Sequence, residues 1–349
     1  MQPQERSERR RSKRPTLKDI AREAGVHVSV VSKVINGSRG NSGVSEATRN
    51  RIFEIARTIG YRPQAAARML RSNRSGIVGV LVKNTDHSSL AHSSTYEEVQ
   101  GVLQVLQGSG YSTMLIRMSE LMSRQSGSLS ERIFREDLLE CLIVLSCSAI
   151  AENTLGPIRN SAPYIVWANS NIFEAENSIR IDEYQAGQML AQLTRERGYR
   201  RVVWAYRPHA THFAHHERFR GFQDVWGKAA PIKICPVHNR PAEKELVNLA
   251  ADLSRDTALI AVSSRVAEDL AWYFARTTMR IGIDFGFACC GSKHDFSQAC
   301  HQLTRIDSRR CEMGMVAAQM ALDILAKQQP VPSRIFTPEL IEGSTLLPV

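Results

Sequence analysis

A histidine-rich stretch contains the side chains best suited, by type and spacing, to do chemistry. Four histidines fall within eight positions of "RPHATHFAHHERFR": His209, His212, His215 and His216. Their imidazole nitrogens could bind zinc or nickel. No cysteine or acidic cluster nearby completes a ligand set at the usual spacing, so the stretch favours a polar loop over a metal site. We therefore expect no metal and no cofactor.

The positive charge of the chain is concentrated in its first fifth. Residues 1–75 contain 17 lysines and arginines against 6 acidic residues, whereas the remaining residues contain 28 against 29. A small basic module on a near-neutral body predicts a polyanion-binding head, most often for nucleic acid. A disordered basic tail that only aids solubility would explain residues 1–15, but not the patterned segment that follows them.

The composition also excludes some classes of protein. There is no run of about 18 apolar residues, which predicts no membrane span, and the N-terminus has no apolar segment of the kind that marks a secretory signal. The seven cysteines form no C-x-x-C pair. This cysteine usage predicts reduced thiols in a cytoplasmic protein.

Two short helices are predicted in the basic head. The first is capped by Thr16 with Asp19 and ends at Gly25. Its apolar residues are Leu17, Ile20, Ala21 and Ala24. The second is capped by Ser45 and ends at Gly60, and its predicted buried stripe is Ile52, Phe53, Ile55, Ala56 and Ile59.

The stretch between these helices, "GVHVSVVSKVIN", has a strand-like alternation of valines. A strand would need a partner, and neither neighbour supplies one. We therefore predict a helix from about His27 or Val28, joined to the first helix by a turn at residues 25–26 to give a helix-turn-helix. The predicted buried face is Val31, Val34 and Ile35, and the opposite face is Val28, Ser29, Ser32 and Lys33.

Residues 16–82 resemble the DNA-binding head and hinge of the lactose-repressor (LacI/GalR) family of bacterial transcription regulators. The helix-turn-helix, the third helix, "GYRP" and "AAARMLR" follow one another in the family's order. The resemblance implies a helix-turn-helix domain at 16–62, a hinge helix at 63–75, and an effector-binding and dimerisation domain at 76–349.

In such a head the second helix enters the major groove, and its early residues meet base edges. Val28 offers a methyl surface to thymine, Ser29 can hydrogen-bond to several bases, and Lys33 can donate to guanine. A phosphate contact is the alternative role for Lys33. His27 and Ser32 complete the predicted contacts of this helix. For His27, helix capping and a phosphate contact remain alternatives.

The connection after this helix, "NGSRGNSGVSE", is about three residues longer than is usual in the family. Arg39 within it either contacts phosphate or is solvated. In the hinge, the resemblance implies that Ala67, Leu70 and Arg71 contact the minor groove. Leu70 would be the wedge that opens the central base step.

Beyond Gly76, strand-like segments such as "GIVGVLV", "CLIVLS" and "ALIAVSS" alternate with helical ones. This order predicts doubly wound α/β lobes with parallel sheets. The resemblance implies a two-lobed body like that of periplasmic sugar-binding proteins, in which the lobes exchange strands. Lobe one is expected at about 76–178 and 308–327, and lobe two at about 179–307 and 328–349.

The resemblance places a small effector, usually a sugar or nucleobase, between the lobes, with the histidine-rich loop at the cleft mouth. Arg218 is expected to hold a hydroxyl or carboxylate through its forked donors, whereas Asp182 is expected to be structural. Other expected contacts are Ser94, Thr95, Trp167, Ala168, Asn169, Ser263 and Gly291. Most polar groups that bind sugars are missing. Either the effector differs from a simple sugar, or the pocket no longer binds one.

The sequence therefore predicts a homodimeric regulator that represses transcription from a palindromic operator, with a small molecule changing its DNA affinity. The effector could either release or tighten DNA. No leucine heptad follows "STLLPV", which favours a dimer over a tetramer. The alternatives are a small-molecule binding protein with a vestigial head and a regulator without effector response. An enzyme is not expected, because the common catalytic and nucleotide-binding motifs are missing.

Overall fold

The structure is a computed structural model that describes most of the chain. The described residues are 15–35, 43–63, 74–82, 93–118, 133, 136–148, 150, 152–227, 230–238, 243–291 and 303–349. They form two compact units, Met1–Arg74 and Ser75–Val349, which we call the head and the body. Across these ranges, no helix has the length and apolar character needed to cross a membrane.

The described residues of the head form three helices, α1 (Leu17–Ala24), α2 (Val28–Ile35) and α3 (Glu46–Thr58). Thr16 and Asp19 form a reciprocal capping box at the start of α1. Gly25 then ends α1 with a φ of 64°, a left-handed conformation that glycine adopts without a Cβ penalty. The stretch with alternating valines is therefore a helix, as predicted, because the turn at Gly25 leads directly into α2.

The core of the head is small and lies where the three helices meet. Its buried residues are Ile20, Ala21, Ala24, Val31, Val34, Ile52 and Ala56. Ile35, Ile55 and Ile59 are only partly buried against this cluster. The prediction for Phe53 was wrong, since its side chain is 39% exposed. One narrow stripe of α3 is enough to close so small a core, and Phe53 lies outside that stripe.

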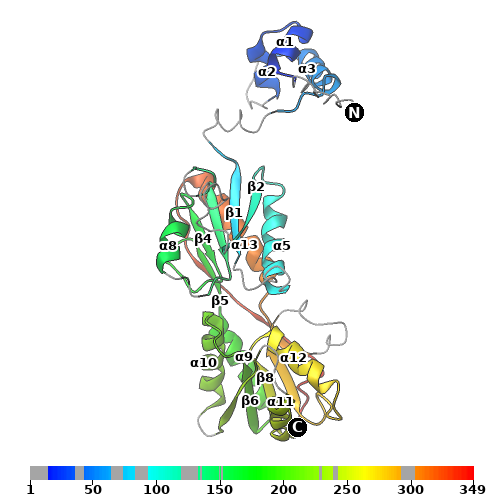
Figure 1. The fold of residues 1–349 in the computed structure, drawn as a ribbon, viewed down its shortest axis with the longest axis vertical. Coiled ribbons are helices and arrows are strands. Elements are labelled where there is room, and N and C mark those ends of the chain that lie inside the picture. The colour runs from blue at the N-terminus through cyan, green and yellow to red at the C-terminus, as the bar shows by residue number, and fades with distance from the viewer. Residues whose placement is uncertain are drawn as a thin grey trace, which may run out of the picture. The chain divides into compact units, whose positions relative to one another are not determined.

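The body has two six-stranded sheets, one in each lobe (Figure 1). Lobe one has the order β11-β5-β4-β3-β1-β2, and every pairing in it is parallel. Its elements are β1 (Ile77–Val82), α5 (Ser93–Leu106), β2 (Ser112–Arg117), β3 (Cys141–Leu145), α8 (Glu152–Arg159), β4 (Ile165–Ala168), β5 (Ser178–Ile181), α13 (Arg310–Lys327) and β11 (Arg334–Phe336).

Lobe two has the order β12-β10-β9-β8-β6-β7, parallel except for β12. Its elements are α9 (Glu183–Glu196), β6 (Arg201–Tyr206), α10 (Phe213–Trp226), β7 (Ile232–Pro236), α11 (Glu243–Ala251), β8 (Thr257–Ala261), α12 (Ser264–Phe274), β9 (Gly286–Cys290), β10 (Thr304–Asp307) and β12 (Glu339–Ile341). The predicted two-lobed α/β body with parallel sheets is confirmed.

The chain passes from one lobe to the other at three short segments, which we call the crossovers. They lie at residue 182, between β5 and α9, at 308–309, between β10 and α13, and at 337–338, between β11 and β12. The predicted lobe change at 178–179 falls too early, because β5 pairs with β4 in lobe one. The segment 328–349 is also divided, since β11 joins the sheet of lobe one. Sequence alternation identifies a strand but not the sheet that it joins.

Two helices in each lobe cross with their backbones in close contact. A Cβ on Gly187 of α9 would lie 2.0 Å from the carbonyl oxygen of Arg218, and one on Gly221 of α10 would lie 2.0 Å from that of Tyr184. Lobe one repeats this arrangement. A Cβ on Gly101 of α5 would lie 1.9 Å from the oxygen of Cys311, and one on Gly314 of α13 would lie 2.2 Å from that of Glu98. These four glycines allow helix axes to approach more closely than any larger residue would permit.

Candidate functional site

The exposed side of α2 is the candidate nucleic-acid surface of the head. Val31 and Val34 are buried in the core, which leaves Ser29 and Lys33 exposed. Val28 and Ser32 are half-buried, and Val28 packs against the core cluster. The predicted separation of α2 into an apolar inner face and a polar outer face therefore holds, with Val28 at the border between them.

His27 caps α2, which is one of the two roles left open for it; a phosphate contact stays a prediction. Its Nδ1 accepts a hydrogen bond of 3.3 Å from the backbone N–H of Ser29 and lies 2.8 Å from the Ser29 hydroxyl. An acceptor at this place satisfies a helix amide that has no partner within the helix. Because Nδ1 accepts the amide proton, the Ser29 hydroxyl must be the donor in the second contact.

Several predicted DNA contacts lie outside the described residues. These are Arg39 in the connection after α2, and Ala67, Leu70 and Arg71 in the hinge. Their roles stay predictions.

In the body, polar residues gather at the carboxyl edge of the lobe-one sheet. Ser146 follows β3 and Asn169 follows β4, and both have positive φ angles, 44° and 49°. Such angles are uncommon outside glycine and cluster at functional sites. Ligands of open parallel α/β sheets bind beyond this edge of the strands. The geometry thus marks the same edge that the sequence pointed to.

A buried ion pair is hydrogen-bonded to this edge of the sheet. Glu98 on α5 is fully buried, and one of its oxygens accepts from Arg310 on α13 and, at 2.6 Å, from the Ser146 hydroxyl. Burial raises the pKa of the Glu98 carboxyl, although the nearby charge of Arg310 opposes that effect. Its second oxygen and the Asn169 Nδ2 have no hydrogen-bond partner among the described residues.

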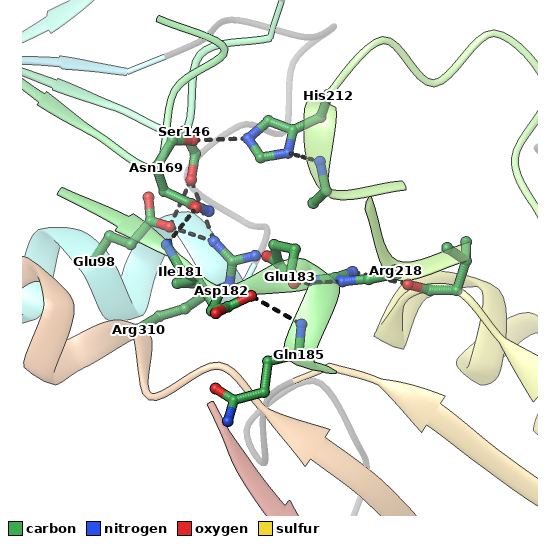
Figure 2. Close-up of polar contacts among 12 residues, drawn as sticks. Glu98, Ser146, Asn169, Ile181, Asp182, Glu183, Gln185, His212, Arg218 and Arg310 are labelled. Carbon is green, nitrogen blue, oxygen red and sulfur yellow. Dashed lines mark hydrogen bonds and ion pairs between the residues drawn. The ribbon is translucent and has the colours of Figure 1, made fainter. Parts of the chain in front are cut away.

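Lobe two has a matching ion pair between its crossed helices (Figure 2). Arg218 on α10 donates to both oxygens of Glu183 on α9, at 2.7 and 2.9 Å, and to the carbonyl oxygen of Val262 at 2.8 Å. Both side chains are buried. The Glu183 charge also contributes to the raised pKa of Glu98 in lobe one.

The histidine-rich stretch supplies structural contacts at the start of α10. His212 caps α10 and its Nε2 lies 2.7 Å from the carbonyl oxygen of Asn169 in lobe one. His215 is largely buried, and burial together with the charge of Arg218 lowers its pKa to about 3. His216 is exposed and contacts Glu217 at 3.1 Å. Within the described part of the chain, no group of three or more His, Cys, Asp or Glu side chains has an arrangement that could hold a metal.

Three predicted effector contacts are instead used for packing. Trp167 is 2% exposed within a core cluster of lobe one, so its ring is not available to stack on a ligand. Ala168 points into the opposite core cluster of the same sheet. Gly291 is buried, and a Cβ there would lie 2.5 Å from the Cβ of Ser264. Side chains of a parallel strand covered on both faces point into packing on either side, which explains the first two corrections.

The remaining predicted residues lie at the two carboxyl edges. Asn169 is fully buried at the junction of the lobes, and Thr95 is half-buried on α5, whereas the side chain of Ser94 lies outside the described residues. Ser263 is the N-cap residue of α12 but makes no side-chain cap hydrogen bond. Asp182 caps α9 by accepting from the backbone of Gln185, the structural role expected for it. The side chain of Arg218 is directed at Glu183 and Val262.

Sequence reasoning missed Glu98, Glu183 and Arg310. A usable signal was present in "DSRRCEMG", where two arginines begin a helix. Cations are unfavourable at a helix N-terminus, so a buried acidic partner could have been suspected. Nothing in the sequence identified which glutamate that partner would be.

The cysteines are thiols with no disulfide among the described positions, as expected for them. Burial raises the pKa of Cys290 to about 12, so this thiol is unreactive at neutral pH.

A three-helix head and a two-lobed α/β body with a polar junction define a DNA-binding regulator with a ligand-binding type of body. Residues 16–64 match the family described as bacterial regulatory proteins, lacI family, and residues 191–346 match a periplasmic binding protein-like domain. The chain thus has a LacI-family DNA-binding domain followed by a periplasmic-binding-protein-like domain, and its relatives are transcription regulators.

Individual relatives are distant in sequence but span most of the chain. The HTH-type transcriptional repressor PurR of Edwardsiella ictaluri (strain 93-146) is 23% identical over 94% of this chain and 95% of its own length. Catabolite control protein A of Priestia megaterium is 23% identical over 78% of this chain and 76% of its own.

Solved structures show the same fold. The lac repressor dimer bound to operator and the anti-inducer ONPF has a TM-score of 0.74 at 16% identity and covers 96% of this chain and 100% of its own. A LacI-family regulator from Silicibacter pomeroyi has a TM-score of 0.69 at 22% identity, over 95% and 99% of the two chains.

Proposed function

We propose that this chain represses transcription as a homodimer on a palindromic operator, and that a small molecule held between its lobes modulates DNA affinity. The observation that supports it most directly is α2, which buries two valines in the head and leaves Ser29 and Lys33 exposed. In a helix-turn-helix, this side of the second helix lies in the major groove. Such a protein acts on cytoplasmic DNA and is a regulator rather than an enzyme.

The chemistry of α2 suggests how bases are read. The Lys33 ammonium has three donors and suits the O6 and N7 acceptors of guanine. The Ser29 hydroxyl donates a hydrogen bond to Nδ1 of His27. Its oxygen can therefore accept a hydrogen bond from the amino group of adenine or cytosine. Half-buried Val28 can still offer methyl groups to thymine. These contacts give one strong discriminating interaction and two weaker ones in each half-site.

The hinge would add specificity that does not depend on direct base contacts. The resemblance to LacI-family hinges implies that Leu70 inserts into the minor groove, with Ala67 and Arg71 of the same segment as further contacts. An apolar wedge separates stacked base pairs, and the energy it requires depends on how easily the central step deforms. A head with few strong base contacts would depend strongly on this deformation energy of the DNA for its specificity.

Exposed apolar residues of the body support the proposed homodimer. They include Tyr96 on α5, Leu115 on β2, Trp272 on α12 and Ile283 in the loop after it. In Figure 1, α5, β2 and α12 lie along the same side of the two lobes. Elements that carry exposed apolar residues along one side of a protein suit an interface. A two-fold dimer formed through this side would match the two-fold symmetry of a palindromic site.

The junction of the lobes favours an effector without net charge. Its two buried carboxylates are each paired with an arginine, Glu98 with Arg310 and Glu183 with Arg218. An anion or cation placed there would leave one buried charge without compensation, which costs several kcal/mol. A neutral molecule with hydroxyl or amide groups, sugar-like or otherwise, fits better. It could meet the unpaired Glu98 oxygen and Asn169 amide.

One observation favours a second candidate, a regulator without effector response. Arg218, the residue expected to hold the ligand, is fully engaged by Glu183 and by the Val262 carbonyl. A ligand that bound Arg218 would have to displace a buried two-point ion pair.

The proposal can be tested in two stages with the full chain. Sequences enriched from a random duplex pool should form one palindrome, bound with a steep dependence on salt. Equal affinity for all sequences would contradict the proposal. A metabolite library would then be screened for a rise in the thermal unfolding midpoint, because a ligand that binds only the folded state stabilises it. Specific DNA binding without any stabilising metabolite would support the second candidate.

A further inference from the structure

A loop of lobe one makes a dense set of contacts with the start of α10 in lobe two. Asn171 in this loop makes two side-chain hydrogen bonds across the lobes. Its Nδ2 donates to the carbonyl oxygen of Thr211 at 2.8 Å, and its Oδ1 accepts from the backbone N–H of Phe213 at 2.9 Å. Phe213 is the first residue of α10, so its amide has no acceptor within the helix. The first amide of a lobe-two helix is thus capped by lobe one.

An arginine reinforces the same contact. The Arg180 guanidinium lies 4.1 Å from the ring centroid of Phe213 in lobe two and 4.7 Å from that of Phe173 in lobe one. It also donates to the carbonyl oxygens of Ser170 and Asn171, each at 3.1 Å. Stacking on aromatic faces and donating to carbonyls are the contacts that a planar guanidinium makes well. Arg180 therefore orients the loop and links it to Phe213.

The third contact is the hydrogen bond between His212 and the Asn169 carbonyl oxygen, at 2.7 Å. Nδ1 of His212 accepts from the Ala214 amide, so Nε2 carries the proton and donates to Asn169. One side chain thereby caps α10 and binds lobe one. The segments 169–173 and 211–214 are thus joined by hydrogen bonds, stacking on an aromatic ring and helix capping.

We propose that residues 169–173 and Arg180 of lobe one, together with 211–214 of lobe two, form a latch that holds the lobes together without a ligand. Every contact in the latch comes from the chain itself. The latch deepens the proposed function by naming what governs access to the junction of the lobes, but it does not rest on DNA binding. A small molecule could reach the junction only after the latch opens. The rate of latch opening would therefore limit the rates of ligand binding and release.

Asn171→Ala and Arg180→Met test the latch, because both changes are in lobe one and the readout is in lobe two. Hydrogen exchange would be measured on the full chain, at the backbone amides of Phe213 and Ala214. Both amides depend on the latch for protection, directly or through His212. We expect each variant to raise exchange at these amides at least tenfold, and the double variant to raise it by less than the product of the two.

Asn248→Ala is the matched control, since Asn248 is exposed on α11 in lobe two. It should leave exchange at Phe213 and Ala214 unchanged. Circular dichroism would show that each variant keeps its fold. Arg180→Met makes the test strict, because Arg180 donates no hydrogen bond to either amide. If Arg180→Met raised exchange only within lobe one, or if neither variant raised it at Phe213, the latch would be refuted whether or not the chain binds an operator.

Discussion

Glu183 and Arg218 form a two-point ion pair that is buried between α9 and α10, beside the glycines at which these helices cross. The same construction occurs in lobe one, where Glu98 and Arg310 pair beside Gly101 and Gly314. In each lobe, two helices in close backbone contact are joined by one buried charge pair. The pair therefore contributes to the rigidity of a lobe as well as to the chemistry of the junction.

Replacing Glu183 with alanine is expected to lower the free energy of unfolding by about 3–5 kcal/mol, because Arg218 would keep a buried charge without a partner. Urea denaturation would measure the loss. Glu243→Gln, at the exposed start of α11, is the control and should change stability by no more than about 0.5 kcal/mol. A small effect of Glu183→Ala would mean that water reaches Arg218 in the folded protein.

Gly221→Ala is expected to destabilise the body by about 1–3 kcal/mol or more, because its Cβ would lie 2.0 Å from the Tyr184 carbonyl oxygen and force the helices apart. Gly108→Ala provides a control. Gly108 lies in the turn after α5 without a left-handed φ, and a Cβ added there would have nothing within 4 Å, so alanine should stabilise by up to about 1 kcal/mol. Opposite signs in thermal or urea unfolding are the expected result. Equal effects would mean that the crossing is loose.

His215 is expected to make stability depend on pH. Burial, then the charges of Arg218 and His212, lower its pKa in the folded protein to about 3 from an ordinary value of about 6.5. Between these two values the unfolded chain binds a proton at this residue and the folded chain does not. The free energy of unfolding therefore falls as pH falls, by at most about 1.4 kcal/mol per unit from this group.

His215→Asn removes that dependence. The stability of the unsubstituted protein relative to this variant should decrease as the pH is lowered from 7 to 4, measured by urea denaturation at each pH. Other titrating groups are common to both proteins and cancel in the difference. A difference that stays constant over this range would show that His215 titrates alike in the folded and unfolded states.

Lys33→Ala separates base reading from phosphate binding. If Lys33 binds guanine, the variant should lose about 1–3 kcal/mol of discrimination at one base pair of each half-site. A phosphate contact would instead weaken binding to all sequences about equally and reduce the salt slope by about one. Affinities for the selected operator and its single-base variants, measured at several salt concentrations, distinguish these outcomes. We expect the first.

Leu70→Ala is expected to weaken operator binding strongly while the body stays folded, because alanine is too short to separate stacked base pairs. A binding titration with the selected operator measures the loss, and circular dichroism monitors the fold. The effect should diminish on operators whose central step is already flexible. Unchanged affinity on the original operator would remove Leu70 from the site.

The helices described in the head could be predicted well because their signals are local. Thr16 with Asp19, Gly25 and Ser45 mark helix ends through contacts within a few residues, and all of them occur in the structure. The valines of α2 suggest a strand if propensity alone is considered. The lack of a neighbouring strand to pair with favours a helix instead. Phe53 was the exception, since periodicity does not give the width of the stripe that a small core buries.

The body was predicted in class but not in its site. Trp167 and Ala168 lie at the end of a strand, and their residue types do not indicate which face of the sheet is covered by packing. Glu98 and Arg310 are 212 residues apart, and only the tertiary fold brings them together. The same holds for Asn171 and Phe213, because capping of one lobe by the other leaves no local pattern.

The glycine crossings constrain how the body can move. Helices in backbone contact cannot slide without collision, so each lobe must move as one piece and the change must be absorbed at the three crossovers. These segments are short, and backbone contacts flank them: the Asp182 amide donates to the Phe336 carbonyl oxygen at 2.9 Å, and Asp307 lies opposite Glu339 in the antiparallel pairing of β10 with β12. Backbone contacts beside these connections oppose sliding of one lobe past the other, so we expect any change in the angle between the lobes to be a rotation about the crossovers.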